Sequence, residues 1–416
     1  MAEPTGTNFL RRYAVAFGSS EARLLQVTGL LGGEVSADGG WITDTTGRRW
    51  LDFGSFGMHL LGHRHPVILA AALDQLALMG LSGKVLGNAA ATGCAEALLA
   101  ATDPQLSRVV LANTGGEAVD MAVKMAILST DREELLAVRG SYHGRTVAAL
   151  AVSDAAPGCD RVGLRNRVHI VAPGDLTAAD AALRTGRVAA AFVEPVQGEG
   201  GIRSMDPEFL AGLRTLCDRT GTLLVLDEIQ TGLGRCGRRW RSADDCVPDL
   251  LLTGKQLGGG LVPLSAVVYR GTRVGPAARD PLVLGSSFSG GALAGRVGAT
   301  VLALVCDEAL LDRVRRLGAA ALARLRRELA GDPRVRDVRG EGLMLGLELA
   351  SPSLAGRVIL EAARRNVLVS FCLNQPHVLR VYPPAVVTPE ELDGGLRALA
   401  AAVAACPMPD ASPVSS

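Results

Sequence analysis

The sequence lacks three features that would tie a protein to a membrane or to an oxidising compartment. Nowhere do 18 apolar residues run uninterrupted, so no membrane-spanning helix is predicted. The N-terminus has no apolar segment after a basic start and does not read as an export signal. The eight cysteines are scattered singly, without a C-x-x-C pair, and we expect reduced thiols. These absences predict a cytoplasmic protein.

An excess of one charge is also lacking. The 43 lysines and arginines face 42 aspartates and glutamates, which gives a formal charge of +1. Binding to a nucleic-acid backbone needs a basic excess, so we expect no nucleic-acid partner. His63 and His65 lie close together in "LGHRHP", but no third ligand is near them, and we expect no metal.

The pattern of apolar runs indicates an α/β fold. Short β-branched or Leu-rich runs alternate with longer segments of helical period, which is typical of βαβ units and a mainly parallel sheet. Helices are expected at residues 118–128 and 207–219. We expect strands at residues 108–111, 134–138, 188–193, 223–226, 250–252 and 265–269.

The length of 416 residues favours two domains over one core. Residues 307–329 read as one long Arg- and Leu-rich helix that links them, and short extended segments and a helix at 389–405 follow. We expect a large domain at residues 51–306 and a small α/β domain at 307–416. Residues 1–50 are expected to join the small domain.

The first chemical motif is "NTGGEA". Gly115 and Gly116 lead directly into a predicted helix, whose free N–H groups and positive dipole end favour a small anion such as a phosphate. The alternative is an ordinary capped helix, with Thr114 as the cap and Glu117 three residues later. Taken alone, this stretch favours the ordinary cap.

Two loops after predicted strands carry further polar groups. "GSYHGRT" places Tyr142 and His143 between glycines, where an aromatic face would cover a flat ring, although loop aromatics usually only pack. "FVEPVQGEGG" ends a strand at Glu194 and leaves Glu199 in a glycine-rich loop, where most glutamates are solvated. In a doubly wound sheet, ligands bind at the edge where the parallel strands end, and both loops follow such strand ends.

The strongest candidates are an acid and a lysine. The buried run "LLVLD" ends at Asp227, and burying a carboxylate without a partner costs several kcal/mol, so a cation is expected there. Lys255, in "TGKQLGGG", follows another strand. Burial lowers the pKa of an amine towards the range in which it acts as a nucleophile.

A rival motif lies between these two residues. "GLGRCG", residues 232–237, matches the G-x-G-x-x-G pattern of dinucleotide-binding enzymes. That motif opens a helix immediately after a strand, whereas here "DEIQT" intervenes and no helical period follows. An oxidoreductase is therefore a weak alternative.

In combination, these stretches resemble the class III aminotransferases, which are pyridoxal-phosphate enzymes of fold type I. The resemblance spans about residues 20–405 and includes "NTGGEA", "YHGRT", "EPVQGEGG", "LDEIQTGLGR", "TGKQLGGGLVP" and "GSSFSGG". It implies pyridoxal 5'-phosphate as the cofactor, a large domain with a mainly parallel seven-stranded sheet, a small α/β domain and a homodimer with shared active sites. The branches it most resembles act on diamines such as putrescine and on acetylornithine.

The resemblance also assigns roles on the cofactor side. Lys255 matches the lysine that holds the cofactor covalently, and Asp227 matches the acid that pairs with the pyridine nitrogen. Ile229 matches the residue packed on the ring face opposite Tyr142, and Gln230 matches the partner of the ring hydroxyl. The remaining matches in the cofactor site are Gly115, Gly116, His143, Glu194 and Ser287, the last reaching the phosphate from the neighbouring subunit.

On the substrate side, Arg380 matches the family's carboxylate-binding arginine and Glu199 its switching partner. Arg145 matches a position that holds a second carboxylate in related enzymes. Phe56 stands where ornithine-specific members carry a tyrosine, which argues against ornithine as the donor.

The expected activity is therefore transfer of an amino group to an α-keto acid. The donor would be a primary amine, a diamine or an ω-amino acid, and the acceptor 2-oxoglutarate or pyruvate, in a ping-pong reaction. An aminomutase, a racemase or another biosynthetic pyridoxal-phosphate enzyme would share the cofactor residues and stays an alternative. Nothing in the sequence supports an idle scaffold.

Overall fold

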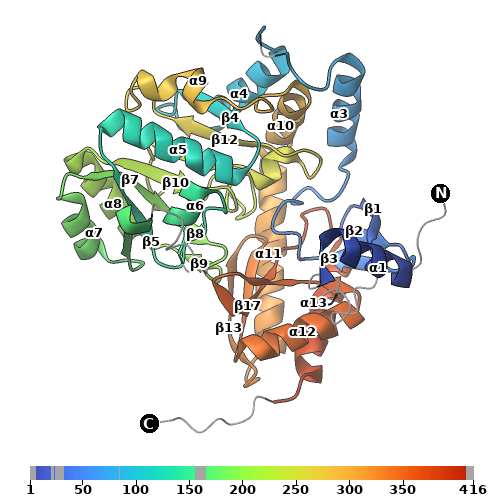
Figure 1. Cartoon of the computed structure of the whole chain (residues 1–416). Helices are drawn as coiled ribbons and strands as arrows, with labels where there is room; N and C mark the ends of the chain where they lie inside the picture. Colours follow the sequence, from blue (N-terminus) through green and yellow to red (C-terminus); the bar gives the residue numbers. More distant parts are fainter. Residues whose placement is uncertain (1–5, 20–22, 24–31, 84, 155–164, 409–416) are drawn as a thin grey trace. The chain divides into compact units, whose positions relative to one another are not determined.

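The computed structural model describes residues 6–19, 23, 32–83, 85–154 and 165–408 (Figure 1). The chain divides into two compact units. The large unit is Pro66–Val314, and the small unit combines Met1–His65 with Arg315–Ser416. The first division falls 15 residues after the boundary predicted at residue 50, and the second falls 8 residues after the boundary predicted at residue 306. The domain bounds derived from the sequence stay predictions.

A seven-stranded sheet forms the centre of the large unit. Its strands are β4 (Arg108–Ala112), β5 (Glu134–Val138), β6 (Val168–Val171), β7 (Val188–Val193), β10 (Leu223–Asp227), β11 (Leu250–Thr253) and β12 (Ser265–Tyr269). The spatial order is β4-β12-β11-β10-β7-β5-β6, and only β12 runs antiparallel to its neighbours. The ends of β5, β7, β10 and β11 therefore meet at one edge, called here the carboxyl edge.

Helices and short segments complete the large unit. The helices are α3 (Pro66–Leu78), α4 (Ala89–Ala101), α5 (Gly115–Thr130), α6 (Val147–Val152), α7 (Leu176–Leu183), α8 (Pro207–Thr220), α9 (Pro281–Leu284) and α10 (Ala292–Val305). A small hairpin joins β8 (Val196–Gln197) to β9 (Arg203–Ser204). The 3-10 turns are η2 (Arg165–Arg167), η3 (Lys255–Gly258) and η4 (Ala277–Arg279).

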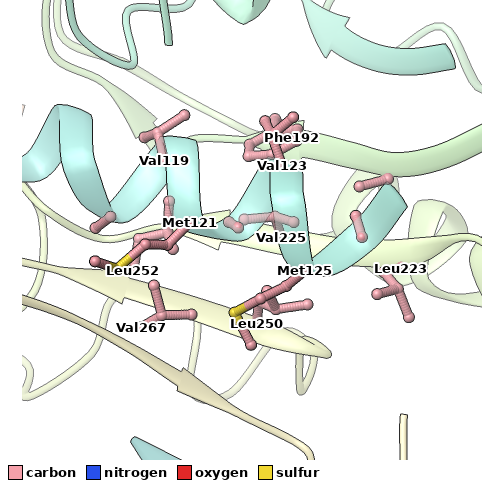
Figure 2. Packing of buried hydrophobic residues seen from close by; sticks show 14 of the residues in the cluster. Val119, Met121, Val123, Met125, Phe192, Leu223, Val225, Leu250, Leu252 and Val267 are labelled. Atoms are coloured by element: carbon pink, nitrogen blue, oxygen red, sulfur yellow. The ribbon is translucent and has the colours of Figure 1, made fainter. Parts of the chain in front are cut away.

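The core of the large unit lies between α5 and the sheet. Figure 2 shows Met121 and Met125 of α5 directed towards Leu252 and Leu250 of β11, and Val119 and Val123 belong to the same buried cluster. Strands β7, β10, β11 and β12 are buried along their whole length, as near-continuous apolar runs in a parallel sheet require. This packing fixes the N-terminus of α5 at the carboxyl edge, because the helix follows β4 after only two residues.

The small unit contains two four-stranded sheets. One has the order β1-β2-β3-β15 and the other β13-β14-β17-β16. Their strands are β1 (Glu34–Asp38), β2 (Trp41–Asp44), β3 (Arg49–Asp52), β13 (Val335–Glu341), β14 (Met344–Leu349), β15 (Val367–Leu368), β16 (Ser370–Cys372) and β17 (Gln375–Val381). The helices are α1 (Gly6–Phe17), α12 (Pro352–Arg364) and α13 (Pro389–Ala405), and α11 (Glu308–Glu328) begins in the large unit.

The expected elements are present with small shifts at their ends. All six predicted strands occur, and α13 has the predicted bounds, with Pro389 in its first turn and a capping box between Thr388 and Glu391. The sequence missed β6, a half-buried strand at the sheet edge. In the residues that the structure describes, no helix is both long and apolar enough to cross a membrane.

The core predicts a large cost for a truncated central strand. Phe192 on β7 is fully buried in the cluster beneath α5, so Phe192→Ala removes a large apolar side chain and leaves a cavity. We expect a loss of about 3–5 kcal/mol in the free energy of unfolding, measured by urea denaturation. Thr215→Ala, on the exposed face of α8, serves as the control and should change stability by less than about 0.5 kcal/mol. Equal effects would contradict this account of the core.

Candidate active site

The N-terminus of α5 is a capped helix start that also leaves room for an anion. Thr114 accepts a hydrogen bond from the N–H of Glu117, and the Glu117 carboxylate accepts from the N–H of Thr114 and of Asn113. Gly115 and Gly116 are the first two helical residues, whose N–H groups have no acceptor within the helix. The expected cap is therefore present, and it does not compete with an anion for these two N–H groups.

Asp227 ends β10 at the carboxyl edge and is buried. Its Oδ2 lies 2.8 Å from Nδ1 of His143, and its Oδ1 accepts from the N–H of Ile229 at 3.0 Å. The His143 ring is fully buried, and in the described part of the chain its Nε2 has no hydrogen-bond partner. The carboxylate of Asp227, where a cation is expected, thus has an imidazole as its partner within the protein.

Electrostatics at this pair favour the proton on His143. Burial works to lower the pKa of His143, but the hydrogen bond and charge of Asp227, with the charge of Glu194, raise it overall. The backbone N–H of His143 donates to Ser153 Oγ at 2.8 Å, which holds the backbone of this residue in place. A protonated imidazole beside the buried carboxylate of Asp227 offsets part of the cost of burying a charge there.

Glu194 lies next to this pair. Leu226 pairs with Val193 across β10 and β7, so Asp227 and Glu194 leave the sheet at the same level. Glu194 accepts from the N–H of Tyr142 at 2.8 Å and of Gly198 at 3.3 Å. Its burial raises its pKa to about 7, an effect that His143 opposes and Asp227 reinforces.

The Ile229 side chain lies close to the first turn of α5 and also to Gly254, the residue before Lys255. A Cβ added at Gly115 would come within 3.0 Å of Ile229 Cδ1, and one at Gly254 within 3.4 Å of Ile229 Cγ2. A Cβ at Gly116 would meet Thr146 at 3.1 Å. Space for a side chain is therefore tight at Gly115, beside Ile229, and at Gly116, beside Thr146.

Lys255 follows β11 at the same edge and begins η3. Its backbone has φ of 42°, in the left-handed region that residues other than glycine seldom occupy. Such strain costs about 1–3 kcal/mol and concentrates at functional sites. The lysine is partly buried, as the sequence predicted for a residue beside tight apolar chain.

The other predicted residues of the large unit differ in their exposure to solvent. Gln230 is buried against Gly198, and Glu199 is also buried, which excludes a solvated loop glutamate. Arg145 and Ser287 are exposed, and Ser287 follows Ser286, whose Oγ lies 3.2 Å from Asn113 Nδ2. The large unit thus brings most of the predicted cofactor residues to the carboxyl edge.

Two predicted substrate residues contact each other in the small unit. The Arg380 guanidinium lies over the Phe56 ring, with Cζ 4.5 Å from the ring centroid. Arg380 is buried and donates from Nη2 to Ser370 Oγ at 2.9 Å, whereas Phe56 is half-exposed.

Neither rival site gains support from the geometry. Residues 229–245 form consecutive turns and bends without a helix, so "GLGRCG" does not open one as a dinucleotide site requires. His63 Nε2 lies 2.8 Å from Asp52 Oδ2. No group of three possible metal ligands occurs in the ranges that the structure describes.

Comparison with known proteins decides the family. The model of the family "Aminotransferase class-III" matches residues 33–403. The chain belongs to the class III aminotransferases. Acetylornithine aminotransferase of Mycobacterium tuberculosis is 35% identical over 372 residues, covering 88% of this chain and 90% of that protein. Ornithine aminotransferase of an Exiguobacterium species is also 35% identical, covering 88% and 92%.

A solved structure agrees with this assignment. Ornithine aminotransferase from Toxoplasma gondii, described with partial occupancy of pyridoxal phosphate at its active site, has a TM-score of 0.87 and 30% identity. The match covers 97% of this chain and 95% of that chain. As a class III aminotransferase, the protein is a pyridoxal-phosphate-dependent transaminase of the α/β type, as the sequence predicted.

The residues at the carboxyl edge fit this cofactor. The glycine-lined turn at Gly115 and Gly116 suits a phosphate, and the carboxylate of Asp227 suits a protonated ring nitrogen. Two further buried polar atoms, Thr253 Oγ1 and Gln256 Oε1, have no hydrogen-bond partner among the described residues. A polar ligand at this edge is consistent with such atoms.

Sequence reasoning missed two partnerships. It named His143 without pairing it to Asp227, and it did not name Ser370 at all. The first has a detectable signal, because "YHG" follows β5 and "LDE" ends β10, and parallel strands bring such ends together. Ser370 has no sequence signature.

The raised pKa of Glu194 predicts a pH-dependent stability. Between the ordinary value of 4.5 and about 7, the folded protein holds a proton that the unfolded chain has lost. Stability should therefore fall as pH rises through this window, by up to about 3 kcal/mol. Glu194→Gln should make the fall shallower in urea unfolding at matched cofactor content. The exposed Glu208→Gln is the control, and parallel curves for all three proteins would refute the assignment.

Proposed function

We propose that this aminotransferase takes its amino group from a terminal primary amine on a diamine or an ω-amino acid and gives it to 2-oxoglutarate or pyruvate. The observation that carries the proposal is the convergence of Gly115, Asp227 and Lys255 at one sheet edge, in a chain 35% identical to acetylornithine aminotransferase over most of its length. Phe56, in place of a tyrosine, favours acetylornithine or a diamine over ornithine.

The proposed cofactor contacts follow from charge and shape. The N–H groups of Gly115 and Gly116 bind the phosphate, and Ser287 of a second subunit adds a hydroxyl. His143 and Ile229 each hold one carboxylate oxygen of Asp227, and we assign the carboxylate oriented in this way to the ring nitrogen. The remaining contacts assigned to the ring and its substituents are those of Tyr142, Glu194, Ile229 and Gln230.

The chemistry divides between the cofactor and one lysine. When bound, pyridoxal phosphate supplies an electron-withdrawing ring that stabilises negative charge on the donor carbon. Asp227 keeps a negative charge beside the ring nitrogen and so favours its protonated form. Lys255 Nζ removes the proton from the donor carbon and, in the second half of the ping-pong cycle, delivers one to the acceptor carbon.

Charged side chains are assigned to the substrate carboxylates. Arg380 binds a substrate carboxylate through its planar guanidinium. When the bound amine has no carboxylate at this position, Glu199 pairs with Arg380 instead. Arg145, exposed in the loop after β5, is assigned the second carboxylate of 2-oxoglutarate.

A homodimer is supported by an apolar surface on the large unit. The exposed apolar side chains of this surface are Leu76, Leu78, Met79, Leu81, Val85, Leu86, Leu282 and Phe288. Its segments meet, since Asn88 Nδ2 donates to the Gly290 carbonyl and the Leu293 N–H donates to the Gly80 carbonyl. Several exposed apolar side chains on neighbouring segments are typical of a protein interface, and they include Phe288, the neighbour of Ser287.

The proposed setting is the cytoplasm. Seven cysteines in the described residues are free thiols, as expected where thiols stay reduced, and Cys159 lies outside those residues.

A donor panel tests the reaction. Putrescine, acetylornithine, ornithine and α-amino acids are each incubated with 2-oxoglutarate or pyruvate, and glutamate or alanine is measured. We expect acetylornithine or the diamine to give the highest kcat/KM. Conversion of a donor without formation of glutamate or alanine would indicate a mutase or racemase instead.

Lys255 provides a second test. Lys255→Ala should lower amino transfer by about 10²–10⁴-fold or more and should remove the visible absorption of the covalently bound cofactor. Lys124→Ala, on the exposed face of α5, controls for loss of a lysine and should retain both properties. A Lys255→Ala protein with unchanged turnover would refute the assignment.

The apolar surface predicts the oligomeric state. Light scattering should show a dimer for the unaltered chain and monomers for a Leu86→Asp and Leu282→Asp double variant, because the charges would be buried without partners. The monomer should also bind the cofactor more weakly if Ser287 acts across subunits. Thr215→Asp, on α8, controls for an added surface charge and should stay dimeric. A monomeric unaltered chain would rule out the shared site.

A further inference from the structure

Arg380 is anchored across a strand pair. It lies on β17, where Ser370 on β16 is its direct cross-strand partner on one side and Gly346 on β14 is its partner on the other. Directly opposed residues in an antiparallel pair have their Cβ atoms close together. The Ser370 hydroxyl accepts from Arg380 Nη2 at 2.9 Å, and it lies 3.3 Å from the Gly54 carbonyl, to which it donates.

The second anchor is the loop that carries Phe56. The residue has φ of 50°, a left-handed conformation that a bulky aromatic rarely adopts. The N–H of Phe56 donates to the Gly54 carbonyl at 2.7 Å, which closes a tight turn. In this turn the ring lies against the Arg380 guanidinium, whose Cζ is over the ring at 4.5 Å from its centroid. The strained backbone is thus accompanied by a specific contact of the side chain.

Asp52 holds this loop in place. Its Oδ1 accepts from the Gly54 N–H at 3.0 Å, and its Oδ2 contacts Ser55 Oγ and lies 2.8 Å from His63 Nε2. Burial works to raise the pKa of Asp52, but these hydrogen bonds lower it overall, so the carboxylate stays ionised. We call these four residues the Asp52 clamp. It holds the two residues that precede Phe56.

The two anchors orient the guanidinium without bringing negative charge to it. Ser370 is neutral and accepts from Nη2, and Cζ lies over the ring of Phe56, which is also neutral. Stacking on a ring favours partners that approach in the guanidinium plane, where two parallel N–H groups grip a carboxylate.

We propose that Ser370 and Phe56 are positioning residues that hold Arg380 in the orientation in which it grips a substrate carboxylate in the guanidinium plane. The inference rests on the proposed role of Arg380. It predicts that carboxylate affinity, rather than the chemical step, depends on both residues.

The experiment uses the cofactor-bound enzyme and glutarate as a probe. Calorimetry measures glutarate binding directly, and steady-state kinetics give KM and kcat for 2-oxoglutarate. Ser370→Ala should weaken glutarate binding and raise KM about tenfold with a smaller change in kcat, because a hydrogen bond to a charged group is lost. Phe56→Leu, which keeps an apolar side chain without a ring, should raise KM about threefold.

Conservative variants separate positioning from stability. Ser370→Thr keeps the hydroxyl and Phe56→Tyr keeps the ring, so both should restore glutarate affinity to within about twofold of the unaltered enzyme. Phe371→Leu, at an exposed phenylalanine next to Ser370, controls for loss of a ring on the same strand. Phe56 is half-exposed, so Phe56→Leu still tests the idea if Ser370→Ala fails to fold.

The outcomes distinguish this inference from the proposed function. If the unaltered enzyme binds no glutarate, the role of Arg380 fails and this inference fails with it. If the unaltered enzyme binds glutarate and Ser370→Ala and Phe56→Leu bind it equally well, only the positioning roles are overturned. A fall in kcat with unchanged KM would also overturn them, because the residues would then act on the chemical step.

Discussion

The arrangement at the carboxyl edge depends on one buried carboxylate. Asp227 ends a strand in the apolar centre of the large unit, where an unpaired charge would cost several kcal/mol. His143 Nδ1 and the Ile229 N–H take one oxygen each, so the acid is held in one orientation before any ligand binds. A second buried acid, Asp249, precedes β11 at the opposite edge and is neutralised by Arg214 and Arg273. Two arginines, which stay charged, fully match the charge of the structural acid Asp249. Among the residues that the structure describes, Asp227 has only one histidine beside it, so its carboxylate can still pair with a second cation.

Small residues define the rest of this edge. A Cβ at Gly115 would come within 3.0 Å of Ile229 Cδ1, one at Gly254 within 3.2 Å of Ser265 Cβ, and one at Gly198 would overlap the side chain of Gln230. Because α5 is fixed by its apolar face against the sheet, its N–H groups point at a defined place. The rigid core therefore positions backbone donors, and the loops after β5, β7 and β10 supply the side chains. This division explains why the sheet is almost entirely apolar and its edge is polar.

Much of the fold could be predicted from the sequence, because its periodicity is strong where burial is complete. The runs at β7, β10, β11 and β12 are buried on both faces, and Thr388, Pro389 and Glu391 mark the start of α13 by a local rule. Strand β6 escaped because it is short, half-buried and interrupted by His169. The residues of the candidate site were found by motif, but their partners were not. His143 and Asp227 are 84 positions apart, and Ser370 meets Arg380 only through the register of β16 on β17.

The left-handed backbone at Lys255 has a consequence for the evolution of this fold. A lysine there carries a conformational cost of the order of 1 kcal/mol that glycine would avoid. Selection for a firmly folded chain would consequently favour loss of the amine, and only the turnover of substrate opposes it. A descendant released from its reaction should drift toward glycine at this point, and it would gain rigidity as it lost its chemistry.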